Sequence, residues 1–212
     1  MLEHLPRWLG AMLRNVRAGH SKLVIVQPEL QIGDAVIDLT SPAFASGARL
    51  PVRFTADGDG VSPPLLWSEP PPGTTSLALI VEDPDAPAMQ PLVHAIVWNL
   101  PAGERHLPEG AIAPDGDGIV GGSDVGRNSL FEGWLPPDPP SGHGSHDYVF
   151  QLFALSETID IGGNPGRSGL VRGLQGRVLG AGMLVGTYSR GEEAPLSGER
   201  ASGERIAGVS PA

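Results

Sequence analysis

The chain has 212 residues, a formal net charge of −10 and a single lysine, Lys22, among its fourteen lysines and arginines. That balance argues against nucleic acid as a partner, because nucleic-acid binding requires a clustered basic surface that releases counterions. The absence of cysteine excludes a disulfide framework and a thiolate zinc site, and it fits a reducing compartment.

Residues 1–19 show the periodicity of an amphipathic helix. Leu2, Leu5 and Leu9 recur at helical spacing, the arginines fall on the other face, and Gly19 is a stop signal. Such a helix could lie on an anionic membrane, or it could dock on its own domain or a partner subunit. With only three arginines we favour docking, and we expect a homodimer.

No apolar run in the sequence reaches the length of a signal-peptide core or of a membrane span. We therefore expect a cytoplasmic protein without stable membrane insertion.

From residue 20 to residue 190 the pattern predicts one β domain. The 30 glycines and 22 prolines of the chain are typical of a turn-rich β protein. Short apolar runs separated by Gly, Pro, Asp and Ser predict strands. These runs cover residues 22–26, 50–54, 76–82, 93–100, 147–155 and 182–189.

Two of these runs, 76–82 and 147–155, are almost continuously apolar, which predicts strands buried on both faces. A short helix is expected at 168–179. Many strands with few, peripheral short helices favour a β-sandwich with mostly antiparallel pairing. Residues 191–212 show no periodicity, so we expect a disordered tail there.

Polar residues gather where several predicted strands end. Segments 57–64, 83–87 and 136–140 combine aspartate with proline, and the last leads through His143 and His146 to Tyr148. Proline-braced loops hold neighbouring side chains at low entropic cost, as a binding site requires.

Aspartate before proline or glycine also makes ordinary turns. We assign that plain role to Asp57 and Asp59. The remaining polar residues are predicted to form a site together: Asp83, Asp85, His94 and His146.

Five segments resemble the phosphatidylethanolamine-binding protein family, specifically its bacterial Raf-kinase-inhibitor-like branch. The string at 83–87 (Asp-Pro-Asp-Ala-Pro), followed by His94 and Val97-Trp98-Asn99, carries the resemblance most clearly. Four further segments agree in order and spacing, so that the resemblance extends from about Phe44 to Arg190. They are 57–67, 126–134, 144–150 and 186–190.

The resemblance implies a β-sandwich with a small anion pocket at one end, which in the family takes phosphate, acetate or a phospholipid head group. Carried over by motif, the ligand-binding residues would be Asp83, Asp85, Pro87, His94, Pro137, His146 and Tyr148. Trp98 and Phe153 are expected in the core instead.

The expected ligand is a small anionic or zwitterionic phosphorylated molecule. Imidazoles can become cationic beside a phosphate and donate hydrogen bonds to it. Asp83 or Asp85 could orient those imidazoles or accept a hydrogen bond from an ammonium group. A mixed lining therefore favours a zwitterionic head group such as phosphoethanolamine, with no cofactor.

The chain departs from the family at four positions. Asp147 replaces the arginine that follows the site histidine, Ala56 and Asp138 stand where cysteine is common, and Pro136 stands where glycine is usual. We expect weaker anion affinity from these departures.

Three other functions are less favoured. Ser145 beside His146 suggests a hydrolase, but the segment lacks a nucleophile elbow and adjacent strand residues point to opposite faces. His143, His146, Asp147 and His94 include metal-ligand types, yet Gly144 and Ser145 between the histidines do not fix a geometry.

The third is a protein partner, as in relatives associated with kinase or protease inhibition, with the pocket regulatory or vestigial. That transfer would rest on fold alone. We therefore expect no catalytic residues, no bound metal and a binding function.

Overall fold

The computed structural model describes residues 12–13, 15–114, 116, 122–131 and 133–190. The expected N-terminal helix falls mostly on residues 1–11, and the expected disordered tail covers 191–212. Residues 1–11 and 191–212 lie outside the described residues, whereas residues 15–19, expected at the end of that helix, are not helical.

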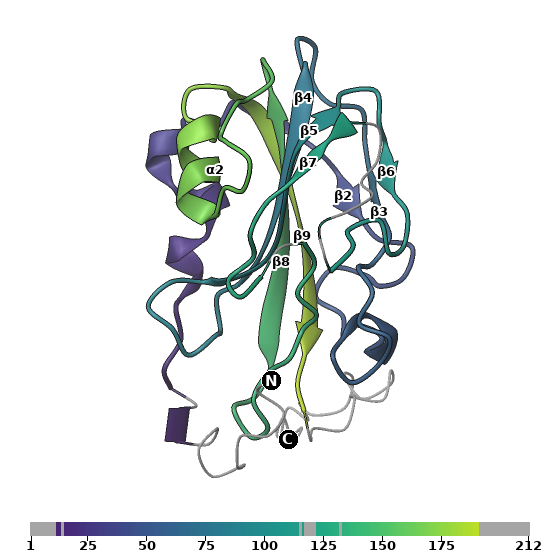
Figure 1. Cartoon of the computed structure of the whole chain (residues 1–212), viewed down its shortest axis with the longest axis vertical. Helices are drawn as coiled ribbons and strands as arrows, with labels where there is room; N and C mark the ends of the chain where they lie inside the picture. Colours follow the sequence, from purple (N-terminus) through teal and green to yellow (C-terminus); the bar gives the residue numbers. More distant parts are fainter. Residues whose placement is uncertain (1–11, 14, 115, 117–121, 132, 191–212) are drawn as a thin grey trace, which may run out of the picture.

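The larger of two sheets runs through the middle of the molecule (Figure 1). Its pairs are antiparallel except β1 with β9, which is parallel. The strands are, in spatial order, β1 (Ala35–Val36), β9 (Val178–Tyr188), β8 (His146–Leu155), β4 (Ser76–Asp83), β5 (Leu92–Pro101) and β7 (Asp124–Val125).

Each face of this sheet has its own cover. A second, antiparallel sheet lies on one side (Figure 1) and is formed by β2 (Leu39–Thr40), β3 (Leu65–Trp67) and β6 (His106–Leu107). On the other side lie α2 (Arg167–Leu174) and the 3-10 turns η2 (His20–Lys22), η3 (Val24–Val26) and η4 (Pro28–Leu30). A further turn, η5, covers Val52–Phe54.

Alternation along β4 divides its side chains between two cores. Leu77, Leu79 and Val81 belong to the core shared with the small sheet, whereas Ala78 and Ile80 belong to the core under α2 and the N-terminal turns. All eight residues of β4 are buried, as the apolar run predicts for a strand covered on both faces. Trp98 and Phe153 are buried core residues, as expected.

The predicted mainly antiparallel β architecture is confirmed, but three elements were predicted wrongly. Residues 22–26 and 50–54 contain 3-10 turns instead of strands. At 22–26 side chains take the place of a neighbouring strand, because the Glu82 carboxylate and the Gln151 side-chain Oε1 accept hydrogen bonds from the amides of Val24 and Ile25. The helix at 168–179 ends at Leu174, because Gly176 has φ +70° and β9 begins at Val178.

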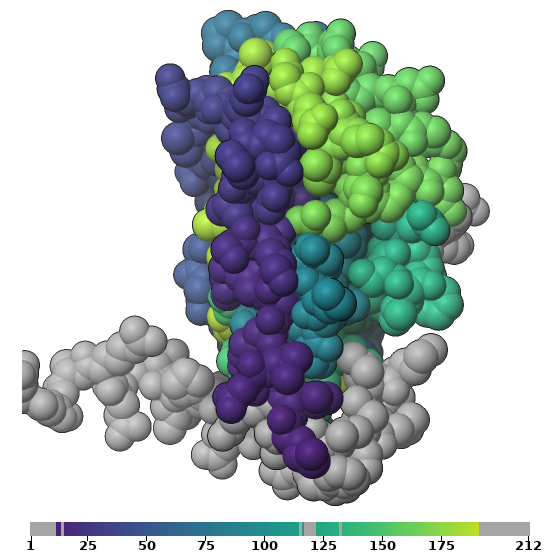
Figure 2. All heavy atoms as spheres, turned by 90° about the vertical axis from the view of Figure 1, so that its left-hand side faces the viewer, coloured from purple at the N-terminus to yellow at the C-terminus, as the bar shows by residue number. Residues whose placement is uncertain are grey.

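Figure 2 shows the N-terminal segment as a continuous ridge beside the loop that follows β4. The amides of Ala18 and Gly19 donate to the carbonyl oxygens of Ala86 and Pro84. None of the described helices has the length and apolar character to cross a membrane.

Candidate functional site

Asp83, the last residue of β4, organises the loop that follows. Its Oδ1 accepts from the amides of Asp85 and Ala86, at 2.8 and 3.0 Å. This turn, braced by Pro84 and Pro87, fixes the carboxylate, so that Oδ2 lies 2.7 Å from His146 Nδ1.

A β-bulge turns His94 toward the same site. Val81 pairs with Ala95 and Glu82 with Val93, so His94 is the extra residue on β5. Regular alternation would place His94 on the α2 side with Ile96; the bulge instead brings its ring to Tyr148, with ring centroids 5.0 Å apart.

The His94 ring is held in one tautomer. Nδ1 lies 2.7 Å from the carbonyl oxygen of Leu135. A carbonyl oxygen only accepts, so Nδ1 carries the proton. Burial lowers the pKa of His94, although Asp83 opposes this effect. Neutral His94 therefore has a lone pair on Nε2.

These residues surround a cavity of about 460 Å³. Its floor is polar, with Asp83, His94, Asp138 and His146, and its walls are apolar. The walls are Ala56, Ala86, Pro87, Ala88, Leu92, Leu130, Phe131, Leu135, Pro136, Pro139 and Pro140.

Among the described residues, three buried side-chain atoms have no hydrogen-bond partner. They are His94 Nε2, Tyr148 Oη and Trp134 Nε1. Both aromatic rings contact His94, whose centroid lies 6.5 Å from that of Trp134. Unpartnered buried polar atoms are rare in folded proteins. Three of them lie in the His94 ring or in the two aromatic side chains beside it, which makes this end of the sheet a candidate site.

A chain of hydrogen bonds runs behind the floor. His143 Nε2 lies 2.8 Å from the carbonyl oxygen of Leu13, His143 Nδ1 lies 2.7 Å from His146 Nε2, and His146 Nδ1 faces Asp83. These three contacts need three protons, one more than two neutral imidazoles carry.

We assign the extra proton to His146, as an imidazolium beside ionised Asp83. Asp83 accepts from two amides through Oδ1 and faces His146 Nδ1 through Oδ2. His143 is the neutral member, because burial and then the charge of His146 lower its pKa.

Arg190 fixes the loop that supplies Asp138. Its guanidinium binds Asp138, contacts the carbonyl oxygen of Pro139 at 3.2 Å and pairs with Asp57 at 2.7 Å. These hydrogen bonds from Arg190 lower the pKa of Asp57. Asp57 thus has more than the turn role assigned from sequence, because it connects the end of β9 to the cavity wall.

Four of the seven predicted ligand residues line the cavity: Asp83, Pro87, His94 and His146. Three lie outside its lining. Tyr148 packs behind His94, Pro137 is buried between two residues of the cavity lining, and Asp85 points to the N-terminal segment.

Two acids near the cavity, Asp85 and Asp147, pair with basic residues of the N-terminal segment. Asp85 pairs with Arg17 and accepts from the amide of Asp147. The Asp147 side chain lies 2.9 Å from His20. The N-terminal segment therefore supplies basic groups beside these two acids.

Most of the apolar wall could not be predicted from the sequence, because residues such as Leu92, Leu130 and Leu135 carry no polar signal. Asp138 could have been found, since it lies in the proline-rich loop that was singled out. The bulge at His94 has no local sequence signature, because it is defined by the pairing of β5 with β4.

Hydrogen bonds within the protein occupy the two histidines that were considered as metal ligands. All four ring nitrogens of His143 and His146 are engaged in the hydrogen-bond chain. Ser145 is exposed and does not line the cavity.

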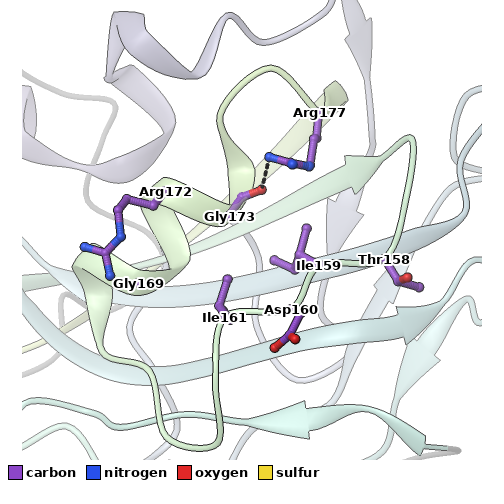
Figure 3. A pocket seen from close by; sticks show the side chains of 8 residues that line it. All are labelled: Thr158, Ile159, Asp160, Ile161, Gly169, Arg172, Gly173 and Arg177. Carbon is purple, nitrogen blue, oxygen red and sulfur yellow. Dashed lines mark hydrogen bonds between the residues drawn. The ribbon is translucent and has the colours of Figure 1, made fainter.

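A second hollow, of about 400 Å³, lies between α2 and the segment after β8 (Figure 3). Arg172 and Arg177 extend from the α2 side, and Arg177 donates to the carbonyl oxygen of Gly173. None of the unpartnered buried atoms named above belongs to its lining. The cavity at His94 is therefore the better candidate site.

The fold and the cavity define a class: a two-sheet β protein with a small, polar-floored pocket at the end of its central strands. Residues 40–189 match the family model for phosphatidylethanolamine-binding protein. A UPF0098 protein of Methanothermobacter thermautotrophicus is 36% identical over 159 residues, which are 73% of this chain and 100% of the relative.

Two solved structures are similar over the same part of the chain. Escherichia coli YbcL, described as a member of the mammalian PEBP family, shares 30% identity with a TM-score of 0.69, over 73% of this chain and 99% of YbcL. A PEBP homologue of Chlamydia trachomatis shares 33% identity with a TM-score of 0.66, over 73% and 98%. The chain belongs to the phosphatidylethanolamine-binding protein family, which confirms the resemblance inferred from its motifs.

Proposed function

We propose that the protein binds a small phosphorylated ligand, with a head group such as phosphoethanolamine, and does not catalyse a reaction. The observation that supports this most directly is the unpartnered Nε2 of buried His94, a residue that lines the cavity. A buried polar atom without a partner costs about 1–3 kcal/mol. A ligand that supplies the partner removes this cost.

The charges of the floor suit a head group with both signs. Asp83 and Asp138 line the cavity and favour an ammonium group, whereas cationic His146 favours a phosphate beside it. The apolar walls exclude water and strengthen both interactions. A zwitterionic ligand would place its ammonium group near the two aspartates and its phosphate near His146.

The absence of catalysis is part of the proposal. His146 has both ring nitrogens engaged with Asp83 and His143, so it has no free position from which to act as a general base. Binding is then the simplest use of the pocket.

Calorimetric titration tests the proposal. Phosphoethanolamine should bind wild-type protein saturably and more tightly than inorganic phosphate. His146→Ala should weaken binding, because it removes the cation beside the phosphate, whereas His106→Ala, on exposed β6, should not. Equal affinity for phosphoethanolamine and inorganic phosphate would contradict the zwitterionic head group.

We also propose a cytoplasmic location and a homodimer. Lack of cysteine supports the first, but a 37% identical relative, LppC of Mycobacterium tuberculosis, is named as a candidate lipoprotein, so cell fractionation is needed. Light scattering tests the dimer: a monomeric mass at micromolar concentration would rule it out, and deletion of residues 1–11 tests whether the N-terminal helix expected from the sequence contributes to it.

A further inference from the structure

The mouth of the cavity at His94 has an apolar rim. Four residues of the cavity lining are also exposed at the surface, and all four are apolar: Ala56, Ala88, Leu130 and Phe131. Leu130 is 49% exposed and Phe131 is 60% exposed, whereas every other phenylalanine, tyrosine and tryptophan in the described part of the chain is buried. Exposed apolar side chains gathered at the mouth of a cavity mark a contact surface.

The fold itself holds the two large rim residues at the surface. Asn128 Oδ1 accepts hydrogen bonds from the amides of Leu130 and Phe131, at 2.8 and 2.6 Å. Between them, Ser129 exchanges two hydrogen bonds with Val93 of β5, because its amide donates to the Val93 carbonyl oxygen and its Oγ accepts from the Val93 amide. Leu130 and Phe131 therefore keep a fixed place beside the sheet.

The N-terminal segment is anchored beside the same cavity. The amide of Ala18 donates to the carbonyl oxygen of Ala86, a residue of the cavity lining. The carbonyl oxygen of Leu13 accepts from His143, and this one imidazole separates it from His146, which also lines the cavity. The first residues of the chain therefore join the described fold close to the cavity.

Residues 1–11 have the composition and the length to cover the rim. They include Leu2, Leu5 and Leu9 at helical spacing, together with Trp8. Eleven residues span about 16 Å as a helix and about 36 Å when extended. Either length is ample for a cavity of about 460 Å³.

We propose that residues 1–11 lie over the mouth of the cavity and bury Leu130 and Phe131, as a lid formed by the chain itself. Because the segment is joined to the fold at Met12, it meets its own rim at an effective concentration of about 1 mM. A second copy in a micromolar solution is far more dilute, so the tether favours the segment of the same chain. With the lid closed, the apolar walls are shielded from water on their open side, and a molecule enters only when the lid lifts.

Trp8 is a built-in probe of the lid in the full-length protein. Trp67, Trp98 and Trp134 are 5%, 3% and 2% exposed, so the fold shields them from a soluble quencher such as acrylamide. Comparison of wild-type protein with Trp8→Phe isolates the fluorescence of Trp8. At micromolar concentration this emission should lie at shorter wavelength than that of free N-acetyltryptophanamide and should be quenched several-fold less.

Substitutions on both sides of the contact test where Trp8 docks. Phe131→Glu places a charge in the apolar rim and removes an aromatic contact, so the equilibrium constant for lid closure should fall about tenfold or more. Leu9→Glu makes the corresponding change in the lid and should expose Trp8 in the same way. Met183→Glu is the matched control, because Met183 on β9 is 51% exposed and lies outside the cavity lining. It should leave Trp8 protected.

The lid is overturned if wild-type Trp8 is quenched as strongly as the free compound, or if its protection persists in either folded glutamate variant of the contact. Should Phe131→Glu not fold, Leu9→Glu still decides. Protection that appears only as the protein concentration rises assigns the rim to a second copy. Protection that requires phosphatidylglycerol vesicles assigns the segment to a membrane surface, and either result overturns a lid formed by the same chain. These measurements use no pocket ligand, so their outcome is independent of the proposed function.

Discussion

Two neighbouring acids at the end of β4 lead to opposite faces of the sheet and have different surroundings. Glu82 points toward the N-terminal turns, where Arg167, the Val24 amide and the Gln151 amide bind its carboxylate at 2.6, 2.9 and 2.8 Å. Every partner of Glu82 comes from the protein itself. The carboxylate therefore connects three distant segments.

Asp83, one residue later, belongs to a cluster that is not complete. Its own oxygens are bonded, but the floor it shares contains the unpartnered Nε2 of His94. A saturated polar cluster contributes to folding, whereas an unsaturated one at a cavity keeps a position open for a ligand. The contrast separates structural from functional acids in a way that burial alone does not, since both are buried.

The largest effect is expected from the saturated cluster. Glu82→Gln removes the carboxylate of a pair whose acid is fully buried, and it leaves the Arg167 guanidinium without its counter-charge. We expect urea unfolding to show a loss of about 3 kcal/mol, at the lower end for broken buried pairs because Arg167 is partly exposed. Glu157→Gln, in the exposed pair with Arg177, is the control and should cost about 1 kcal/mol or less.

The next largest effect is the dependence of stability on pH, which comes from the histidines near the cavity. Burial lowers the pKa of His94 and His143, so the unfolded chain binds protons below its histidine pKa that the folded chain does not. The contribution of these two rings to stability is complete above about pH 6.5 and should fall as pH decreases below it, by up to about 1.4 kcal/mol per imidazole between pH 7.5 and 5.5.

Urea unfolding at several pH values measures this loss, and His143→Gln should reduce it by the share of one imidazole. An equal loss in wild-type protein and in folded His143→Gln would show that this ring is not held neutral.

A smaller loss is expected from Asp83→Asn, which sharpens the contrast with Glu82→Gln. The asparagine oxygen can still accept from the amides of Asp85 and Ala86, and its NH2 can donate to neutral His146. The expected cost is about 1 kcal/mol, the value of an ordinary hydrogen bond. Nitrogen-15 NMR should show His146 losing its extra proton; retention of the imidazolium would contradict the assigned ion pair.

The smallest effect is expected at the partly exposed pair of Arg17 and Asp85. Arg17→Gln removes one partner, but Asp85 still accepts from the Asp147 amide. Unfolding should show a cost of about 1 kcal/mol or less. A loss as large as that of Glu82→Gln would show that the N-terminal segment contributes far more to stability than its contacts suggest.

Much of the fold could be predicted from the sequence because buried strands are apolar throughout. The runs at 76–82, 93–100 and 147–155 agree with β4, β5 and β8 to within one or two residues. The run at 22–26 looked equally apolar and formed turns, because its amides bind side chains of residues more than fifty positions away. Hydrogen bonds from such distant side chains, in place of those from a neighbouring strand, leave no signal in the local sequence.

The site was predicted in its polar half only. Short sequence motifs identified Asp83, His94 and His146, because acidic and imidazole side chains are recognisable candidates for a binding site. The opposite role of Glu82 depends on Arg167, and the orientation of His94 depends on a bulge defined by pairing with β4. Both are properties of the assembled sheet rather than of any segment.

The order in which the chain is made has a consequence for the N-terminal segment. Arg17 contacts the Ser145 carbonyl oxygen across 128 positions, and Leu13 contacts His143 across 130. Arg190 reaches back 133 positions to Asp57. Contacts of such long range close late and slow folding. During synthesis the first residues therefore wait for nearly the whole domain to emerge, and the pocket is completed only when the last strand joins the sheet.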